Sequence, residues 1–194
     1  MKVLVACEYS GVVSKAFRDK GHATLSCDLL DHEKGDKRHY KGDVRDLLHL
    51  DWDLMIAHPP CTHLAVSGAR WFKDKEEEQK EALDFVRTLM EADIPRICIE
   101  NPVSIISSRI RKPDQIIQPW MFGHEVTKTT CLWLKNLPML VPTNVVDKGK
   151  RHVTKSGKSL PEWYNLPPSE DRWKIRSKTF QGIADAMSLQ WGNI

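Results

Sequence analysis

The chain has 194 residues, of which 41% are hydrophobic and 28% charged, and its formal net charge is +3. This length is enough for one complete hydrophobic core and leaves little room for a second, so we expect a single domain. It contains no apolar run long enough to cross a membrane, and the first apolar run turns polar at Glu8, which argues against a signal peptide. We therefore expect a soluble intracellular protein.

The first half of the chain alternates apolar runs with a helical pattern. Residues 2–7 form a short β-branched run, and 11–18 follow with apolar residues at helical spacing. Residues 23–27 and 53–57 are again apolar and short, as is typical of buried strands. This order predicts strand, helix, strand, strand.

The second half continues the alternation. Residues 72–92 have the spacing of an amphipathic helix, and 94–99 and 129–134 of strands. The stretch 142–168 is polar and rich in glycine and proline, which predicts a long loop, before helical spacing returns at 176–191. Strands alternating with helices predict an α/β sandwich with a mostly parallel sheet and helices on both faces.

The cysteines and histidines indicate neither disulfides nor a metal site. Five cysteines are an odd number and form no CxxC pair, so reduced thiols are expected. None of the eight histidines has a partner at the spacing of a metal-binding helix, so no zinc site is expected. Four cysteines belong to apolar runs, whereas Cys61 follows two prolines in a predicted loop.

Polar motifs come directly after the predicted strands. They are Glu8–Gly11, Asp28, Asp43, His58–Cys61 and Glu100–Pro102. In open parallel sheets, ligands bind beyond the carboxyl ends of the strands. The sequence therefore predicts one binding site to which all five motifs contribute.

Two of these motifs have residues suited to chemistry on a pyrimidine ring. Carbon 5 of cytosine becomes nucleophilic only after a soft nucleophile adds to carbon 6 and a proton donor binds N3. Cys61, on a loop made rigid by Pro59 and Pro60, is a candidate nucleophile. Glu100 is a candidate acid if loss of water keeps it partly protonated. His58 and His63 flank Cys61, where they either tune its pKa or brace the loop.

Each motif alone also has a purely structural interpretation. Most lone cysteines are inert, and Glu100-Asn101-Pro102 is compatible with a simple turn. Two such motifs, each following a buried strand of the same predicted sheet, favour the catalytic interpretation.

Pro59-Pro60-Cys61 followed by Glu100-Asn101 resembles the DNA (cytosine-5) methyltransferase family. The resemblance implies a Rossmann-like methyltransferase sandwich, S-adenosylmethionine as cofactor, and DNA as substrate. Residues 8–11 resemble the loop that receives the cofactor, although Val12, Val13 and Ser14 replace its usual glycines. Asp28 stands where the family binds the ribose, and Asp43 where it binds the adenine amine. The cofactor contacts implied by the resemblance are Glu8, Tyr9, Ser10, Gly11, Asp28, Asp43, Pro59 and Pro60.

The resemblance covers most of residues 1–135 and weakens toward the end of that range. Residues 123–130 take the place of a segment in which two arginines contact the base and brace the site, and here these positions are Lys128 and Thr130. Residues 176–182 resemble the last family motif, which packs back on the cofactor pocket. The resemblance implies the catalytic set Cys61, Glu100, Asn101, Lys128 and Thr130.

The large target-recognition domain of the family is missing. The division implied is a methyltransferase core at 1–141, a short basic segment at 142–175, and a C-terminal helix at 176–194. From Lys148 to Lys178 there are nine basic and three acidic residues. The segment either contacts phosphates and stacks on bases, or is a solvated loop pinned by its aromatic side chains. The candidate nucleic-acid contacts are Lys150, Arg151, Lys155, Lys158, Trp163 and Arg172.

Several alternatives stay open. The same chemistry is compatible with a modified S-adenosylmethionine donor, with RNA, or with a cytosine nucleotide. A catalytically inactive decoy or regulator that binds nucleic acid or cofactor is a second class. An amino-methyltransferase is disfavoured, because Cys61 and Thr62 follow Pro-Pro where an aromatic residue would stack on the base. Compact sequences of this kind resemble phage and prophage proteins, which implies the cytoplasm of a bacterium or an infected host.

Overall fold

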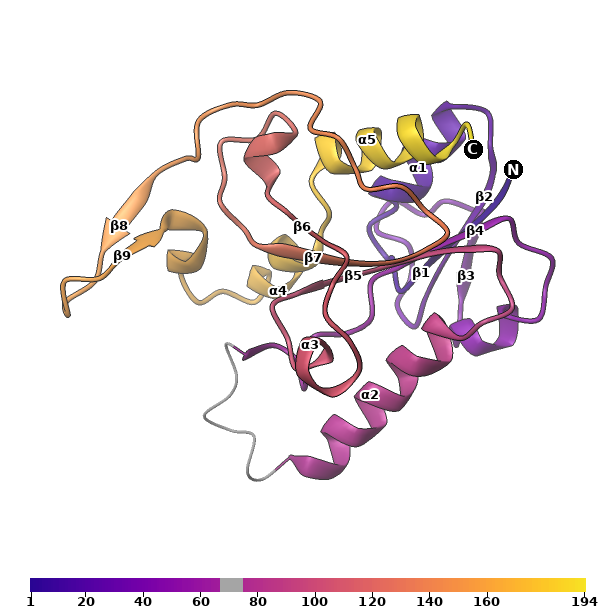
Figure 1. The fold of residues 1–194 in the computed structure, drawn as a ribbon, viewed down its shortest axis with the longest axis horizontal. Coiled ribbons are helices and arrows are strands. Elements are labelled where there is room, and N and C mark those ends of the chain that lie inside the picture. Colours follow the sequence, from indigo (N-terminus) through magenta and orange to yellow (C-terminus); the bar gives the residue numbers. More distant parts are fainter. Residues whose placement is uncertain (67–74) are drawn as a thin grey trace.

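The computed structural model describes residues 1–66 and 75–194 and has one central sheet of seven strands (Figure 1). The strand order is β3-β2-β1-β4-β5-β7-β6. Neighbouring strands from β3 to β5 are parallel, whereas β7 is antiparallel to both β5 and β6. The strands are β1 Lys2–Ala6, β2 Ala23–Asp28, β3 His39–Lys41, β4 Leu54–Ala57, β5 Arg96–Pro102, β6 Gln115–Ile117 and β7 Thr130–Lys135.

Helices cover both faces of the sheet, as Figure 1 shows. On one face α1 (Val12–Asp19) and α5 (Gln181–Trp191) pack in a buried cluster around Phe17 and Trp191. On the other face lie α2 (Glu76–Met90) and α3 (Ile106–Arg109). Because both faces are covered, the strands are nearly continuous apolar runs, and β4 is buried at every position. The predicted Rossmann-like α/β sandwich is confirmed.

Several predicted boundaries differ from the structure. The helix predicted at 72–92 is observed as α2, which begins at Glu76, and residues 72–74 of the prediction lie outside the described part. Strand β5 extends through Pro102, so Glu100 and Asn101 belong to the strand rather than following it. Two strands of only three residues, β3 and β6, were not predicted. They are short and partly exposed, and therefore lack an apolar run.

The basic segment contains regular structure, where the sequence predicted a loop. Its first residues pair with the body, because the Val146 N–H donates to the Trp120 carbonyl at 2.9 Å. A hairpin of β8 (Arg151–Val153) and β9 (Ser159–Pro161) then projects from the body (Figure 1). After it comes α4 (Arg172–Ser177), which crosses the predicted boundary at 175.

Three short 3₁₀ helices complete the described structure. They are η1 (Val44–Leu47), η3 (Pro119–Met121) and η4 (Glu162–Asn165). None of the helices in residues 1–66 and 75–194 is both long and apolar enough to cross a membrane.

Candidate active site

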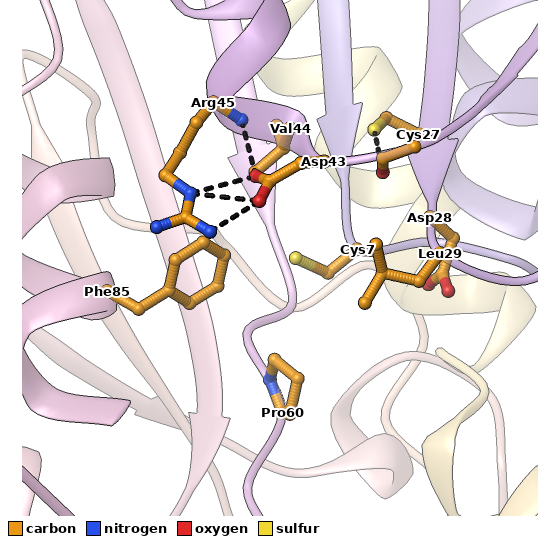
Figure 2. A pocket seen from close by; sticks show the side chains of 10 residues that line it. Cys7, Cys27, Asp28, Leu29, Asp43, Val44, Arg45, Pro60 and Phe85 are labelled. Carbon is orange, nitrogen blue, oxygen red and sulfur yellow. Dashed lines mark hydrogen bonds and ion pairs between the residues drawn. The ribbon is translucent and has the colours of Figure 1, made fainter. Parts of the chain in front are cut away.

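A cavity lies where the strand order reverses between β1 and β4, which is the usual ligand site of a doubly wound sheet. Its volume is about 270 Å³, near the lower end of the range for small-molecule sites. Figure 2 shows that side chains from four strand ends and from α2 converge on it. It is lined by Cys7, Cys27, Asp28, Leu29, Gly42, Asp43, Val44, Arg45, Pro60 and Phe85.

Two carboxylates supply most of the polar character of this cavity. Asp28 accepts a hydrogen bond from the Leu30 N–H at 2.9 Å through Oδ1, and its Oδ2 makes no hydrogen bond within the described residues. Asp43 accepts the Arg45 N–H at 2.9 Å and Nε–H at 3.0 Å, and these bonds lower the pKa of Asp43. Arg45 also lies over the Phe85 ring at 6.0 Å. The cavity thus has anionic acceptors beside apolar walls.

The first loop is folded against the protein rather than into the cavity. Glu8 is buried, and its carboxylate accepts the N–H groups of Val13 at 2.6 Å and Ser14 at 3.1 Å. It therefore caps the N-terminus of α1, where a negative charge is favourable. Gly11 has φ 71°, and a Cβ there would overlap the His32 ring. Glu8, Ser10 and Gly11 shape the loop, and none of them lines the cavity.

Tyr9 lies under the C-terminal segment. Its hydroxyl donates to the Lys174 carbonyl at 3.1 Å, and its ring centroid is 5.5 Å from that of Trp173. The Glu33 carboxylate pairs with Lys178 on the same side. Helix α4 therefore covers the first loop, and of the predicted cofactor residues only Asp28, Asp43 and Pro60 line the cavity.

The loop that carries Cys61 is tied to strand β5. Asn101 is buried and donates from Nδ2 to the Pro59 carbonyl at 2.8 Å. Beyond the cysteine, the Ala65 N–H donates to the Cys61 carbonyl at 2.9 Å, and Ala65 bridges to Ser104. The loop of His58–Cys61 and the motif Glu100–Pro102, which are far apart in the sequence, are therefore in direct contact, and the Asn101 side chain holds them together.

His58 and Glu100 form a buried pair. Nδ1 of His58 lies 2.9 Å from Oε2 of Glu100, and both side chains are largely inaccessible to solvent. Burial disfavours the charged forms, but the hydrogen bond and the opposite charge outweigh it, so the pKa of His58 is raised and that of Glu100 is lowered. The expectation that burial keeps Glu100 partly protonated is therefore wrong. His58 acts on Glu100 rather than on Cys61.

Cys61 is exposed, in contrast to the buried Cys27, Cys98 and Cys131. Protein atoms around the thiol nevertheless raise its pKa, as does the negative charge of Glu100, while Lys128 acts in the opposite direction. The thiol is therefore protonated at neutral pH.

Lys128 connects this centre to the C-terminal segment. Its Nζ donates to the Arg176 carbonyl at 3.0 Å and lies 5.4 Å from the ring centroid of Trp163 and 5.8 Å from that of Phe180. Its charge also lowers the pKa of Glu100. Thr130, by contrast, is buried in β7, where its hydroxyl donates to the Lys128 carbonyl at 3.3 Å. Thr130 thus braces the backbone at Lys128.

The predicted nucleic-acid residues fall into two groups. Trp163 packs on Phe180 at 5.2 Å between ring centroids, so it pins the segment to the body. Arg172 is half-buried at the start of α4. The remaining four side chains are exposed on and beside the projecting hairpin: Lys150, Arg151, Lys155 and Lys158.

Some residues of this site were not predicted from the sequence. Arg45 binds Asp43, Phe85 forms an apolar wall, and Leu29 stands at the cavity with 71% of its surface exposed. Arg45 lies two residues after a predicted acidic contact, which is the one local signal available. Phe85 reaches the cavity because of where α2 packs on the sheet, which no local sequence pattern indicates.

Comparisons with known proteins show a likeness among solved structures. No family model matches the chain, and no curated protein matches it. Among solved structures, it is similar to a prophage-encoded protein of E. coli that is provisionally described as a DNA modification methyltransferase, with a TM-score of 0.50 and 13% identity. The likeness covers 76% of this chain and 52% of that one, so the chain spans about half the length of its neighbour. At this identity, the likeness shows that the two share an α/β fold.

Proposed function

We propose that the protein is an S-adenosylmethionine-dependent methyltransferase that modifies carbon 5 of cytosine in DNA through a covalent adduct of Cys61. The observation that carries the proposal is the double tie between the Cys61 loop and β5. Asn101 holds the Pro59 carbonyl, and Glu100 holds His58, so the loop that carries the thiol is tied to the strand that carries the carboxyl group. This loop adjoins the cavity at the strand ends, which Pro60 lines.

The cavity residues fit the adenosine half of the cofactor. The unengaged Oδ2 of Asp28 is an acceptor for ribose hydroxyls. Both oxygens of Asp43 accept hydrogen bonds from Arg45, so Asp43 would bind an exocyclic amine only in exchange for one of these bonds. Leu29, Phe85 and Pro60 supply apolar surface for a flat ring. S-adenosylmethionine bound here would supply an electrophilic methyl group.

The remaining residues provide the activation that cytosine requires. Cys61, once deprotonated, forms a bond from sulfur to carbon 6, and the ring electrons move through carbon 4 to N3. N3 then takes up a proton from the His58–Glu100 pair, which leaves carbon 5 nucleophilic. Lys128 is close enough to Glu100 to favour negative charge there and is held by Arg176, Trp163 and Phe180. It takes the place in which the family has an arginine.

DNA is the substrate that the charge distribution favours. The exposed lysines and arginine of the hairpin region lie on the same segment whose Trp163 and α4 cover Lys128 and Tyr9. A basic surface connected to the active site suits a phosphate backbone next to a base turned out of its stack. The described neighbour, a DNA modification methyltransferase by its provisional description, agrees with this choice.

Covalent trapping tests the proposal. DNA containing 5-fluorocytosine is incubated with the protein and S-adenosylmethionine, and a denaturation-resistant adduct is expected. The Cys61→Ser variant should form none, while the matched control Cys131→Ala, at a buried thiol of β7, should form it. Absence of an adduct with any cytosine polymer, despite cofactor binding by calorimetry, would favour the inactive decoy instead.

Mass spectrometry of nucleosides from cells that express the protein identifies the product. A mass increase of one methyl group on deoxycytidine supports the proposal as stated. A larger group would indicate a modified donor, and a modified cytidine would indicate RNA. An unchanged nucleoside pool in both polymers, combined with adduct formation on free nucleotide, would assign the reaction to a cytosine nucleotide.

A further inference from the structure

His58 is placed by the sheet rather than by its loop. It follows β4 directly, and its N–H donates to the Ala6 carbonyl of β1 at 2.9 Å. Because β4 and β5 are parallel neighbours in which Ala57 pairs with Ile99, the next residues, His58 and Glu100, lie side by side. The 2.9 Å contact between their side chains is therefore fixed by two strands of the core.

The surroundings of this imidazole are charged on three sides. Glu100 comes from β5, Glu8 from the loop after β1, and Lys128 from the segment before β7. The two glutamates favour an imidazolium and Lys128 opposes it. Nε2 of His58 is buried and has no hydrogen-bond partner within residues 1–66 and 75–194, which also favours the neutral ring. Groups of opposite charge therefore act on the same ring, and a proton on His58 is stabilised by the glutamates and opposed by Lys128.

We propose that His58 is a positioning residue that stores on Nδ1 the proton that Glu100 delivers to N3 of the cytosine. The inference rests on the proposed function and deepens it. The family pattern pairs the thiol only with a glutamic acid, whereas here a second ionisable group of the chain shares the acid's proton. The pair, and not Glu100 alone, is the proton donor.

The proton balance is complete without any external reagent. In the resting chain the pair holds one proton, on Nδ1 of His58, and Glu100 is a carboxylate. Transfer of this proton to Glu100 gives a neutral imidazole and a carboxylic acid. When the Cys61 thiolate bonds to carbon 6, the acid gives the proton to N3 and is a carboxylate again, beside a neutral His58. The thiol proton of Cys61 leaves to solvent, to which this residue is exposed.

A pH dependence follows from the number of protons on the pair. The pair holds one proton between the lowered pKa of Glu100 and the raised pKa of His58, which lies above 6.5. Within this range the acid function is available, and it is lost as the pH rises through the pKa of His58. Without the imidazole, the proton is available only below the pKa of Glu100 itself, so the alkaline limit of adduct formation moves to lower pH.

Two substitutions at His58 separate proton storage from hydrogen bonding. His58→Asn keeps an N–H donor at the position of Nδ1, toward Glu100, but carries no titratable proton, and His58→Gln moves its N–H to the position of Nε2 and loses the bond to Glu100. The rate of 5-fluorocytosine adduct formation is measured from pH 5 to pH 9 in both. We expect the alkaline limit to fall by more than one pH unit and the rate at pH 8 to fall at least tenfold. The matched control is His49→Asn, at an exposed position just after η1, which should keep the wild-type limit. A wild-type profile in His58→Asn would overturn the proposal.

Nuclear magnetic resonance gives a readout that needs no turnover. The ring nitrogens of His58 are followed from pH 4 to pH 9 in the Cys61→Ser protein and in the same protein with Glu100→Gln. We expect His58 to titrate at a higher pH when Glu100 is present, and equal midpoints would overturn the inference. If the wild-type protein forms no adduct, the proposed function fails and proton delivery fails with it. If the adduct forms but the midpoints are equal, only the role of His58 fails.

Discussion

Removing the carboxamide of Asn101 is the sharpest test of how the site is held together. Asn101 is 1% exposed, and the only hydrogen bond of its side chain in the described structure runs from Nδ2 to the Pro59 carbonyl at 2.8 Å. In Asn101→Ala that carbonyl loses its partner, which costs about 1 to 3 kcal/mol. The void left by the carboxamide adds about 1 kcal/mol. Oδ1 is buried without a partner, so its removal returns part of this cost.

We therefore expect the free energy of unfolding to fall by about 1 to 3 kcal/mol, which lowers the melting temperature by about 2 to 4 °C per kcal/mol in a chain of this size. Urea unfolding monitored by circular dichroism measures the change. The matched control is Gln190→Ala, which breaks two hydrogen bonds of 2.8 Å to the Val141 backbone at an exposed position. A surface change of this kind is expected to cost about 0.5 kcal/mol or less.

Asn101→Ala should raise the reactivity of Cys61 toward a disulfide reagent and lower the rate at which Cys61 forms an adduct with DNA. Burial and the charge of Glu100 both raise the pKa of Cys61. A released loop exposes the thiol to water and moves it away from Glu100, so the rate of modification by a disulfide reagent should rise severalfold. Adduct formation with DNA should fall at least tenfold, because the thiol and Glu100 are no longer held together. If Asn101→Ala unfolds like Gln190→Ala and leaves both rates unchanged, the tie between Asn101 and Pro59 does not organise the site.

Three further predictions concern the frame around the site. In Gly11→Ala, the positive φ and the overlap with His32 should lower the free energy of unfolding by about 2 kcal/mol or more, measured by urea unfolding. Adding His32→Ala should recover part of this loss, since only the backbone strain of about 1 kcal/mol then remains. Equal stability of the single and double variants would contradict the overlap. In Glu8→Gln, loss of the charge that caps α1 should cost about 1 to 2 kcal/mol at pH 7 by the same measurement, and a cost below 0.3 kcal/mol would refute the capping role. Hydrogen bonds from Arg38 and the charge of Arg18 lower the pKa of Asp36 from its ordinary value of 3.8 to about 2. The ionised carboxylate therefore stabilises the fold above pH 3.8, and this contribution is lost as the pH falls toward 2. Asp36→Asn should therefore lower the free energy of unfolding at pH 7 and have little effect at pH 2. A difference between the variant and the wild type that does not change with pH would contradict the lowered pKa.

Local sequence determined the elements with the strongest patterns. Continuous apolar runs predicted β1, β2, β4, β5 and β7 to within a few residues, because strands buried on both faces need such runs. Amphipathic spacing predicted α1, α2 and α5. The hairpin of β8 and β9 was not predicted, since its residues are mostly exposed and polar and carry no alternation that separates a strand from a loop.

For the candidate site, too, one part could be inferred from the sequence and another part depends on the tertiary structure. The sequence by itself determined that Cys61, Glu100 and Asn101 belong to one centre, because each follows or ends a strand whose carboxyl edge must face the same side of a parallel sheet. Only the tertiary structure decided how they are connected. The partner of His58 is Glu100, which lies 42 residues away, and the register of β4 against β5 brings them together. The ionisation of both groups then follows from burial and charge, which are properties of the packed structure and not of any local motif.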